Sequence, residues 1–290
     1  MKPSVYFTKE LTPESVKSLF DRLGVKLPGK VALKLHSGEA GNQNFLGPEW
    51  FAPLVEELRA TVVECNTAYP GARDTTKKHL KLLKDHGWSK AFDVDLMDAT
   101  GPDAVLAIPN GKIIQEDYVG KDLLNYDALV VVSHFKGHPM GGYGGALKQL
   151  SIGCASSFGK LHIHSAGSDK PAEIWTADHD RFLEAMADAA SAVYGHFKGR
   201  IAFVSIMKNM SVDCDCCAVA EDPCLQDIGI LASLDPIAID QACLDRVYAS
   251  TDPGKAHFIE RVESRHGVHT IEAAASLGFG SRDYDLKRVK

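Results

Sequence analysis

The sequence has 290 residues, of which 45% are hydrophobic, enough to bury the core of one large domain or two modest ones. Its formal net charge of -6 provides no basic surface, so nucleic acids and anionic membranes are not expected partners. No run approaches the roughly 18 apolar residues that a membrane span needs, and the opening MKPSVYFTKE lacks the apolar stretch of a signal peptide. We therefore expect a cytoplasmic protein.

Short apolar runs rich in β-branched residues alternate with helix-like stretches along the chain. In the first part of the chain we predict a helix over Glu14–Leu23, a strand over Val31–Leu35, a helix over Pro48–Arg59, a strand over Thr61–Val63 and a helix over Thr75–His86. Further along we predict a strand over Ala128–Val132, a helix over Asp180–Tyr194, strands over Ile201–Ile206 and Ile228–Leu231, and a helix over Pro236–Tyr248. Thr12, Thr75 and Asp235 are candidate N-caps. The alternation predicts an α/β fold with a mostly parallel sheet and helices on both faces. We expect a single domain over residues 1–290. This domain could be divided into two lobes with a cleft between them.

Polar residues follow directly after three of the predicted strands, in the segments Lys34–Gly38, Cys65–Arg73 and Ser133–His138. Open α/β sheets bind ligands outside the carboxyl ends of their strands, so these segments are candidate binding loops. Arginine and lysine there suit a carboxylate or phosphate, and a histidine can move a proton near neutral pH. Each of these residues could instead be an ordinary surface charge.

The segment His134–Lys148 contains five glycines, which leave the backbone bare and able to approach a ligand closely. Amides exposed at a helix start would favour an anion. Gly137 and Pro139 favour a loop around the histidines, and the glycine spacing matches neither a P-loop nor a dinucleotide fingerprint. A single histidine is usually a satisfied polar residue, but this segment also brings together several histidines, a lysine and a cysteine, which favours a site. They are His134, His138, Lys148, Cys154, His162 and His164.

Four of the seven cysteines fall within eleven residues, at Cys214, Cys216, Cys217 and Cys224. Thiolates suit zinc or iron-sulfur clusters, yet the spacing matches neither a paired zinc motif nor a ferredoxin motif. Inert buried thiols, a zinc site without redox function and iron-sulfur ligation therefore all stay open. Cys65 continues a predicted strand and Cys243 lies inside a predicted helix, so we expect both to be packing residues.

Three sequence blocks together resemble the domain of unknown function 362 family, which is associated with iron-sulfur centres. They are the Asn66–Gly71 turn with Arg73 and Thr75, then SHFKGHPMGGYGGALKQLSIGCASSFGKLHIHS, and finally DCDCC with DIGILASLDPIAIDQACLD, spanning residues 60 to 248 or so. The resemblance implies that Cys154, Cys214 and Cys216 ligate a 4Fe-4S cluster. A fourth thiolate from Cys217 or Cys224 would close the cluster for electron transfer, whereas an open iron could bind substrate as a Lewis acid.

Many relatives carry a ferredoxin-like module between the positions matching His164 and Trp175, where this chain has only a short connection. No separate ferredoxin module is therefore expected, and redox work would need an external ferredoxin-type partner. A fainter resemblance links His138, Gly142–Gly145, Lys148 and His164 to lactate racemase-like proteins, which hold a nickel-pincer nucleotide. It implies that Lys148 contacts a cofactor and that His164 reaches the metal. Leu147 stands where those proteins have an arginine, and the cysteine cluster has no place in them.

Our leading hypothesis is a cytoplasmic iron-sulfur enzyme of anaerobic metabolism, an oxidoreductase, lyase or isomerase that acts on a small anionic molecule at or beside the cluster. One alternative is an isomerase that uses a nickel or nucleotide-like cofactor held by the glycine-rich segment. The other is a non-catalytic electron carrier or structural zinc protein. The candidate catalytic residues are His134, His138, Lys148 and His164, the candidate substrate-binding residues are Lys34, His36 and Arg73, and the candidate metal ligands are Cys154, Cys214, Cys216, Cys217 and Cys224.

Overall fold

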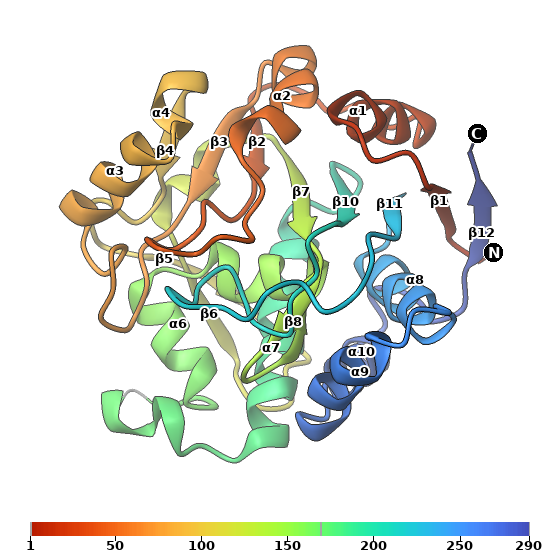
Figure 1. The fold of residues 1–290 in the computed structure, drawn as a ribbon. Coiled ribbons are helices and arrows are strands. Elements are labelled where there is room, and N and C mark those ends of the chain that lie inside the picture. The colour runs from red at the N-terminus through yellow and green to blue at the C-terminus, as the bar shows by residue number, and fades with distance from the viewer. Residues whose placement is uncertain (1, 169, 290) are drawn as a thin grey trace.

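Figure 1 shows the computed structural model of the protein, which describes residues 2–168 and 170–289. Within these residues an eight-stranded sheet has the order β12-β1-β11-β10-β7-β2-β3-β4. Its strands are β1 (Ser4–Thr8), β2 (Val31–Lys34), β3 (Thr61–Glu64), β4 (Val94–Leu96), β7 (Ala128–His134), β10 (Ile201–Met207), β11 (Gly229–Ser233) and β12 (Asp285–Arg288).

Five of the seven neighbouring strand pairs in this sheet are parallel, and the two pairs that involve β11 are antiparallel. This arrangement confirms the predicted α/β fold with a mostly parallel sheet. Every residue of β2, β7, β10 and β11 is buried, as expected for strands that are covered on both faces.

Two apolar cores lie on opposite faces of the sheet, because side chains alternate along each strand. Val130 and Val132 of β7 belong to one core, and Leu129 and Val131 belong to the other. Helices α1 (Pro13–Arg22) and α2 (Ala52–Leu58) cover the first face, and α7 (His179–His196) and α8 (Pro236–Tyr248) cover the second. Figure 1 shows α1 and α2 on one side of the sheet and α8 on the other.

The remaining elements surround this frame. The helices are α3 (Thr76–Asp85), α4 (Trp88–Ala91), α5 (Ala146–Lys148), the π-helical η3 (Gln149–Gly153), α6 (Ser157–His164), α9 (Lys255–Ser264), α10 (Val268–Ser276) and the 3-10 helices η1 (Pro48–Trp50), η2 (Lys121–Asn125) and η4 (Pro171–Trp175). Two small antiparallel hairpins pair β5 (Ala104–Ala107) with β6 (Glu116–Val119) and β8 (Lys136–His138) with β9 (Gly142–Gly144). None of the helices in the described ranges has the length and apolar character needed to cross a bilayer.

The predicted helix starts are confirmed by their caps. The side chains of Thr12, Thr75 and Asp235 each accept a hydrogen bond from a backbone N–H in the first turn of α1, α3 and α8. The predicted helix over Pro48–Arg59 is instead divided into η1 and α2 at Phe51. Pro53 explains the break, because it lacks the N–H that a continuous helix would need there.

Candidate functional site

Strands β2, β3, β7 and β10 are parallel, so the segments that follow them meet at one edge of the sheet. A small cavity of about 30 Å³ lies among these segments. The side chains that line it include Lys34, His36, Glu64, Tyr69, Arg73, Lys136, Lys148, Lys160 and Cys216. Of the predicted site residues, the structure thus brings Lys34, His36, Arg73, Lys148 and Cys216 together around this cavity.

Two cysteines and one histidine converge beside the cavity. One donor atom from each of His138, Cys214 and Cys216 lies within 4.8 Å of the other two, and this is the one such group in the described ranges. A tetrahedral zinc ion sits roughly 2.0–2.3 Å from nitrogen and sulfur ligands, so a small inward movement would bring all three donors into range. Three protein ligands leave a fourth position open, as catalytic zinc sites do. The residues therefore fit a single soft metal ion.

The other predicted cysteine ligands lie outside this three-donor group. Cys154 is buried in the core, where burial raises the pKa of its thiol to about 12 despite the charge of Lys34. The Cys224 thiol contacts the carbonyl oxygen of Met210 at 3.6 Å. Cys217 is partly exposed, and a hydrogen bond with Cys216 lowers its pKa. Metal ligation by these three cysteines stays a prediction.

Cys65 and Cys243 lie in the apolar core, as predicted for packing residues. Burial raises the pKa of both thiols well above the usual value. Both are therefore neutral at physiological pH.

The ring of His138 is held by the backbone of the following turn. Its Nδ1 atom accepts hydrogen bonds from the N–H groups of Met140 at 3.1 Å and Gly141 at 2.8 Å. The proton of the neutral ring is then on Nε2, and burial followed by the charge of Lys148 lowers the His138 pKa to about 4. Ligation of a metal through Nε2 would move this proton to Nδ1, so the two amides would have to release the ring.

His134 contacts the cysteine loop, the segment of residues 211–224 between β10 and β11. Its Nδ1 atom lies 2.9 Å from a carboxylate oxygen of Asp215, and its Nε2 atom donates to the carbonyl oxygen of Lys208 at 2.6 Å. Lys136 also pairs with Asp215, at 2.8 Å. Burial alone would raise the pKa of Asp215, but His134 and Lys136 outweigh it and lower the pKa. Both His134 nitrogens are engaged, so neither faces a ligand.

His164 also lies away from the cavity wall. Its Nδ1 atom donates to the carbonyl oxygen of Lys160 at 2.7 Å, and its ring stacks on Phe182 with centroids 5.1 Å apart. Burial lowers its pKa to about 3, so the ring is neutral. These contacts give His164 a packing role within the fold, and its predicted contact with a metal stays a prediction.

The glycine-rich segment differs from the predicted loop, since it forms the β8–β9 hairpin and then turns into α5. Glycine is required at residue 137 because a Cβ there would lie 2.2 Å from the backbone oxygen of Val212 in the cysteine loop. The amides of Ala146 and Leu147 donate to Asp240 at 2.7 and 3.0 Å. These two amides at the helix start therefore bind a carboxylate of the protein itself, so neither is free to bind an anionic ligand.

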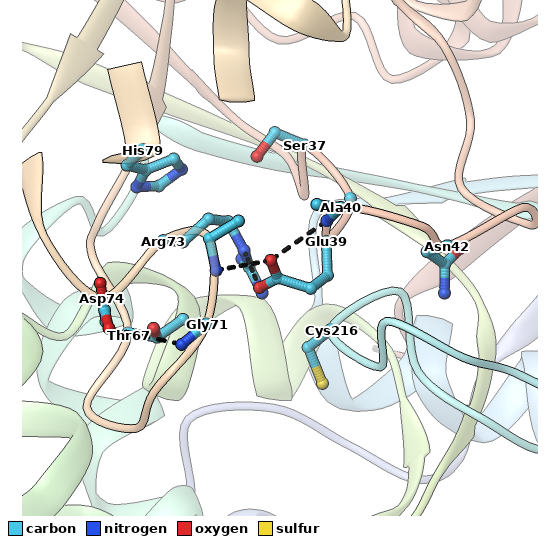
Figure 2. Close-up of polar contacts among 12 residues, drawn as sticks. Ser37, Glu39, Ala40, Asn42, Thr67, Gly71, Arg73, Asp74, His79 and Cys216 are labelled. Atoms are coloured by element: carbon cyan, nitrogen blue, oxygen red, sulfur yellow. Dashed lines mark hydrogen bonds and ion pairs between the residues drawn. The ribbon is translucent and has the colours of Figure 1, made fainter. Parts of the chain in front are cut away.

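Arg73 is buried and contacts two other residues of the site. Its Nε donates to Glu39 at 3.1 Å, and its Nη1 lies 3.2 Å from Nε2 of His36. Burial and the Arg73 charge lower the pKa of His36 well below its usual value. Glu39 also accepts from the N–H of Ala72 at 2.9 Å, and its own N–H donates to the carbonyl of Asp215. In Figure 2 the Glu39 carboxylate points toward Arg73, with Cys216 on the adjacent loop.

Three consecutive residues with amide side chains, Asn42, Gln43 and Asn44, form hydrogen bonds with the cysteine loop. None of them was among the site residues predicted from the sequence. Asn42 donates to the carbonyl oxygens of Cys214 at 3.3 Å and Cys217 at 2.9 Å, and its own oxygen accepts from two backbone amides. Gln43 and Asn44 each donate to one further carbonyl of the loop. The run begins four residues after Gly38, the end of the predicted binding segment Lys34–Gly38, but its amides resemble those of any polar loop.

Lys160 is a further residue of the site that was not among those predicted from the sequence, as are Glu64, Tyr69 and Lys136 in the same cavity wall. It is 5% exposed, it lines the cavity, and its ammonium donates to the carbonyl oxygen of Ala155 at 2.6 Å. Lysines are almost never buried without a partner. One lysine in the helix of residues 157–164 carries no sequence signal that would separate it from a surface lysine.

Replacing Asn42 by alanine is expected to weaken metal binding by about tenfold to a hundredfold, the usual effect of losing a residue that positions metal ligands. Asn42→Ala removes both hydrogen bonds that orient the backbone of Cys214 and Cys217. Titration of the metal-free, reduced protein with Co²⁺ measures the affinity. Gln43→Ala is the matched control, since it removes one bond to Ala220, further along the loop. Equal affinities for the two variants would contradict the positioning role.

Comparison with known proteins places the chain in a family. The family described as domain of unknown function (DUF362) matches residues 31–245, which confirms the family that the sequence blocks indicated. No curated protein matches the chain.

Two solved structures match the chain at low similarity. The lactate racemase apoprotein from Thermoanaerobacterium thermosaccharolyticum is 15% identical, with a TM-score of 0.44 over 69% of this chain and 50% of that one. A Thermotoga maritima protein solved by a structural genomics consortium is 14% identical, with a TM-score of 0.45 over 91% of this chain and 58% of that one. The chain thus spans only part of the length of either protein.

Proposed function

The chain belongs to the domain of unknown function 362 family, and from that premise we propose that it is a metal-dependent enzyme acting on a small anion. Cys214 and Cys216 would hold the metal, with His138 at the third corner. The observation that carries this proposal is the contact between the three-donor group and the cavity. Cys216 lines the cavity itself, and the ammonium of Lys148 lies both in the wall and 3.8 Å from the sulfur of Cys214.

The cavity wall supports the anionic substrate. Lys34, Arg73, Lys136, Lys148 and Lys160 all line it, and arginine and lysine bind carboxylate and phosphate groups by charge-assisted hydrogen bonds. A bound metal with an open position would supply Lewis acidity at the same place. The residues of the wall would bind the anion and orient it.

An iron-sulfur cluster is the second candidate for the metal centre. The supporting observation is a third thiol, because Cys217 is partly exposed and its side chain interacts with that of Cys216. A cubane cluster holds each thiolate on a different iron, so it needs its sulfurs more widely spaced than one ion does. The close approach of the three donors therefore favours a single ion. Action in anaerobic metabolism, a nickel or nucleotide-like cofactor and an external ferredoxin-type partner stay predictions.

Metal analysis of protein purified without oxygen tests the proposal. We expect one equivalent of a divalent metal per chain, and Co²⁺ added to the metal-free protein should show the strong absorption of tetrahedral thiolate ligation. Replacement of His138 by alanine should weaken this spectrum without abolishing it. Iron together with inorganic sulfide would instead support the second candidate. A protein that binds neither a metal nor a cluster would overturn the proposal.

A further inference from the structure

We infer that the cavity binds a compact anion with two negative charges, held by Lys148, Lys160 and Arg73. This inference rests on the proposed function, since it names the ligand class of the same cavity. A singly charged carboxylate such as a simple monoacid would leave the site with an unbalanced positive charge. The charge that the ligand must carry depends on which cations of the wall already have a carboxylate partner.

Three of the five cations in the wall are neutralised by buried carboxylates. Lys34 pairs with Glu64 at 2.6 Å, Arg73 with Glu39 at 3.1 Å and Lys136 with Asp215 at 2.8 Å. Lys148 and Lys160 have no carboxylate partner within ion-pair distance in the described part of the chain. These two amines are therefore the cations of the wall that lack a counter-ion. Burial lowers the pKa of Lys160, and an anion bound beside it would favour its charged form.

Residues that line the same cavity also have unused hydrogen-bond donors. The Nη2 atom of Arg73 is buried and has no hydrogen-bond partner, although the residue lines the cavity and is only 3% exposed. Lys160 donates one of its three N–H groups to the carbonyl oxygen of Ala155. Among the described residues, the ammonium of Lys148 has one hydrogen-bond partner, the sulfur of Cys214. Buried donors are rarely left unpaired, so an acceptor-rich ligand fits the site.

The pairing count concerns the cavity wall and does not change with the metal. A divalent ion held by the thiolates of Cys214 and Cys216 would add two positive charges and two negative ones. Lys148 and Lys160 would still have no carboxylate partner within ion-pair distance among the described residues. The cavity of about 30 Å³ restricts the ligand, or the part of it that enters, to a small group.

Anion binding to the full-length protein tests the inference, both as purified and after metal removal. Sulfate and methanesulfonate are nearly equal in shape but differ by one charge. At fixed ionic strength and pH 8, calorimetry should find sulfate binding at least about tenfold tighter, a difference of about 1.4 kcal/mol. Hydrogen phosphate and malonate, run in parallel, distinguish a tetrahedral oxyanion from a dicarboxylate as the source of the two charges. Tight binding of either one supports the inference.

Replacement of Lys160 by methionine keeps most of the side-chain volume and removes one unpaired charge. The preference for sulfate over methanesulfonate should then disappear, because the wall retains a single surplus charge. Lys198→Met, at an exposed lysine outside the cavity, is the matched control and should keep the preference. If Lys160→Met does not fold, Lys148→Met removes the other unpaired charge and should have the same effect.

Equal binding of sulfate and methanesulfonate to the unmodified protein would overturn the inference, as would an equal loss in Lys160→Met and Lys198→Met. These outcomes are separable from the metal proposal. A protein that prefers dianions but binds no metal would retain this inference and lose the proposed metal centre. A protein that binds a metal at Cys214 and Cys216 but shows no dianion preference would do the reverse.

Discussion

Replacement of Cys214 by serine is expected to weaken metal binding by about a hundredfold or more. The structural zinc of small proteins contributes roughly 10–16 kcal/mol from four ligands, so each ligand contributes several kcal/mol. Cys214 is fully buried, lies in the three-donor group and contacts Lys148, so serine would remove one of the two sulfur donors of that group. Competition with a chromophoric chelator measures the affinity.

Cys224→Ser is the control for this experiment, because Cys224 lies on the same loop but outside the three-donor group. Its affinity should stay close to that of the unmodified protein. Equal losses in Cys214→Ser and Cys224→Ser would show that the loop, rather than the three-donor group, determines binding. Cys154→Ser tests the four-iron hypothesis in the same assay, since a cluster that uses Cys154 would be lost in that variant as well.

Replacement of Glu64 by glutamine is expected to lower the free energy of unfolding by about 3–5 kcal/mol, the usual cost of leaving one charge of a buried pair without its partner. Lys34 and Glu64 are 0% and 3% exposed and lie 2.6 Å apart. Glu64 also accepts from the backbone N–H and the hydroxyl of Ser37. Urea denaturation at pH 7 measures the change.

The double variant Lys34→Met with Glu64→Gln should be more stable than Glu64→Gln alone, because it leaves no unpaired charge. Lys81→Met, which removes one partner of the exposed Lys81–Asp85 pair in α3, should change stability little. A Glu64→Gln variant as stable as the unmodified protein would show that the buried pair is not required.

The same pair predicts a dependence on pH. Burial alone would raise the pKa of Glu64, but Lys34 outweighs it and lowers the pKa to about 2, from an ordinary value of 4.5. The ionised form is therefore favoured in the folded state, and its stabilisation is present above pH 4.5 and lost as the pH falls toward 2. The stability difference between the unmodified protein and Glu64→Gln should shrink over this range. A difference that stays constant would contradict the lowered pKa.

Local patterns in the sequence were sufficient for the fold class and for much of the site. Runs such as Ala128–Val132 are long and β-branched enough to predict a buried strand. The carboxyl ends of parallel strands lie at the same edge of a sheet. The segments that follow these strands contain Lys34, Arg73 and Cys216, so their positions near one edge follow from the topology. The predicted N-caps were correct for the same reason, because capping depends on only a few adjacent residues.

The partners of these side chains could not be derived in this way. Asn42 and Cys214 are 172 positions apart, yet they are joined by a hydrogen bond. Ala146 and Asp240 are separated by 94 positions, and their contact occupies an amide that the sequence alone left open to a ligand. Such contacts depend on how two distant loops approach each other, and no local pattern records that approach.

The sequence by itself therefore determined the mostly parallel α/β fold, the family and the edge of the sheet at which cations and cysteines gather, because periodicity and motif spacing are local properties. Only the tertiary structure decided which members of those groups meet. In the folded chain His138 lies beside Cys214 and Cys216, whereas Cys154 is buried in the apolar core. Lys160 lies in the cavity wall. The reason is that donor geometry and charge balance depend on distances across the fold, which side-chain packing and burial determine.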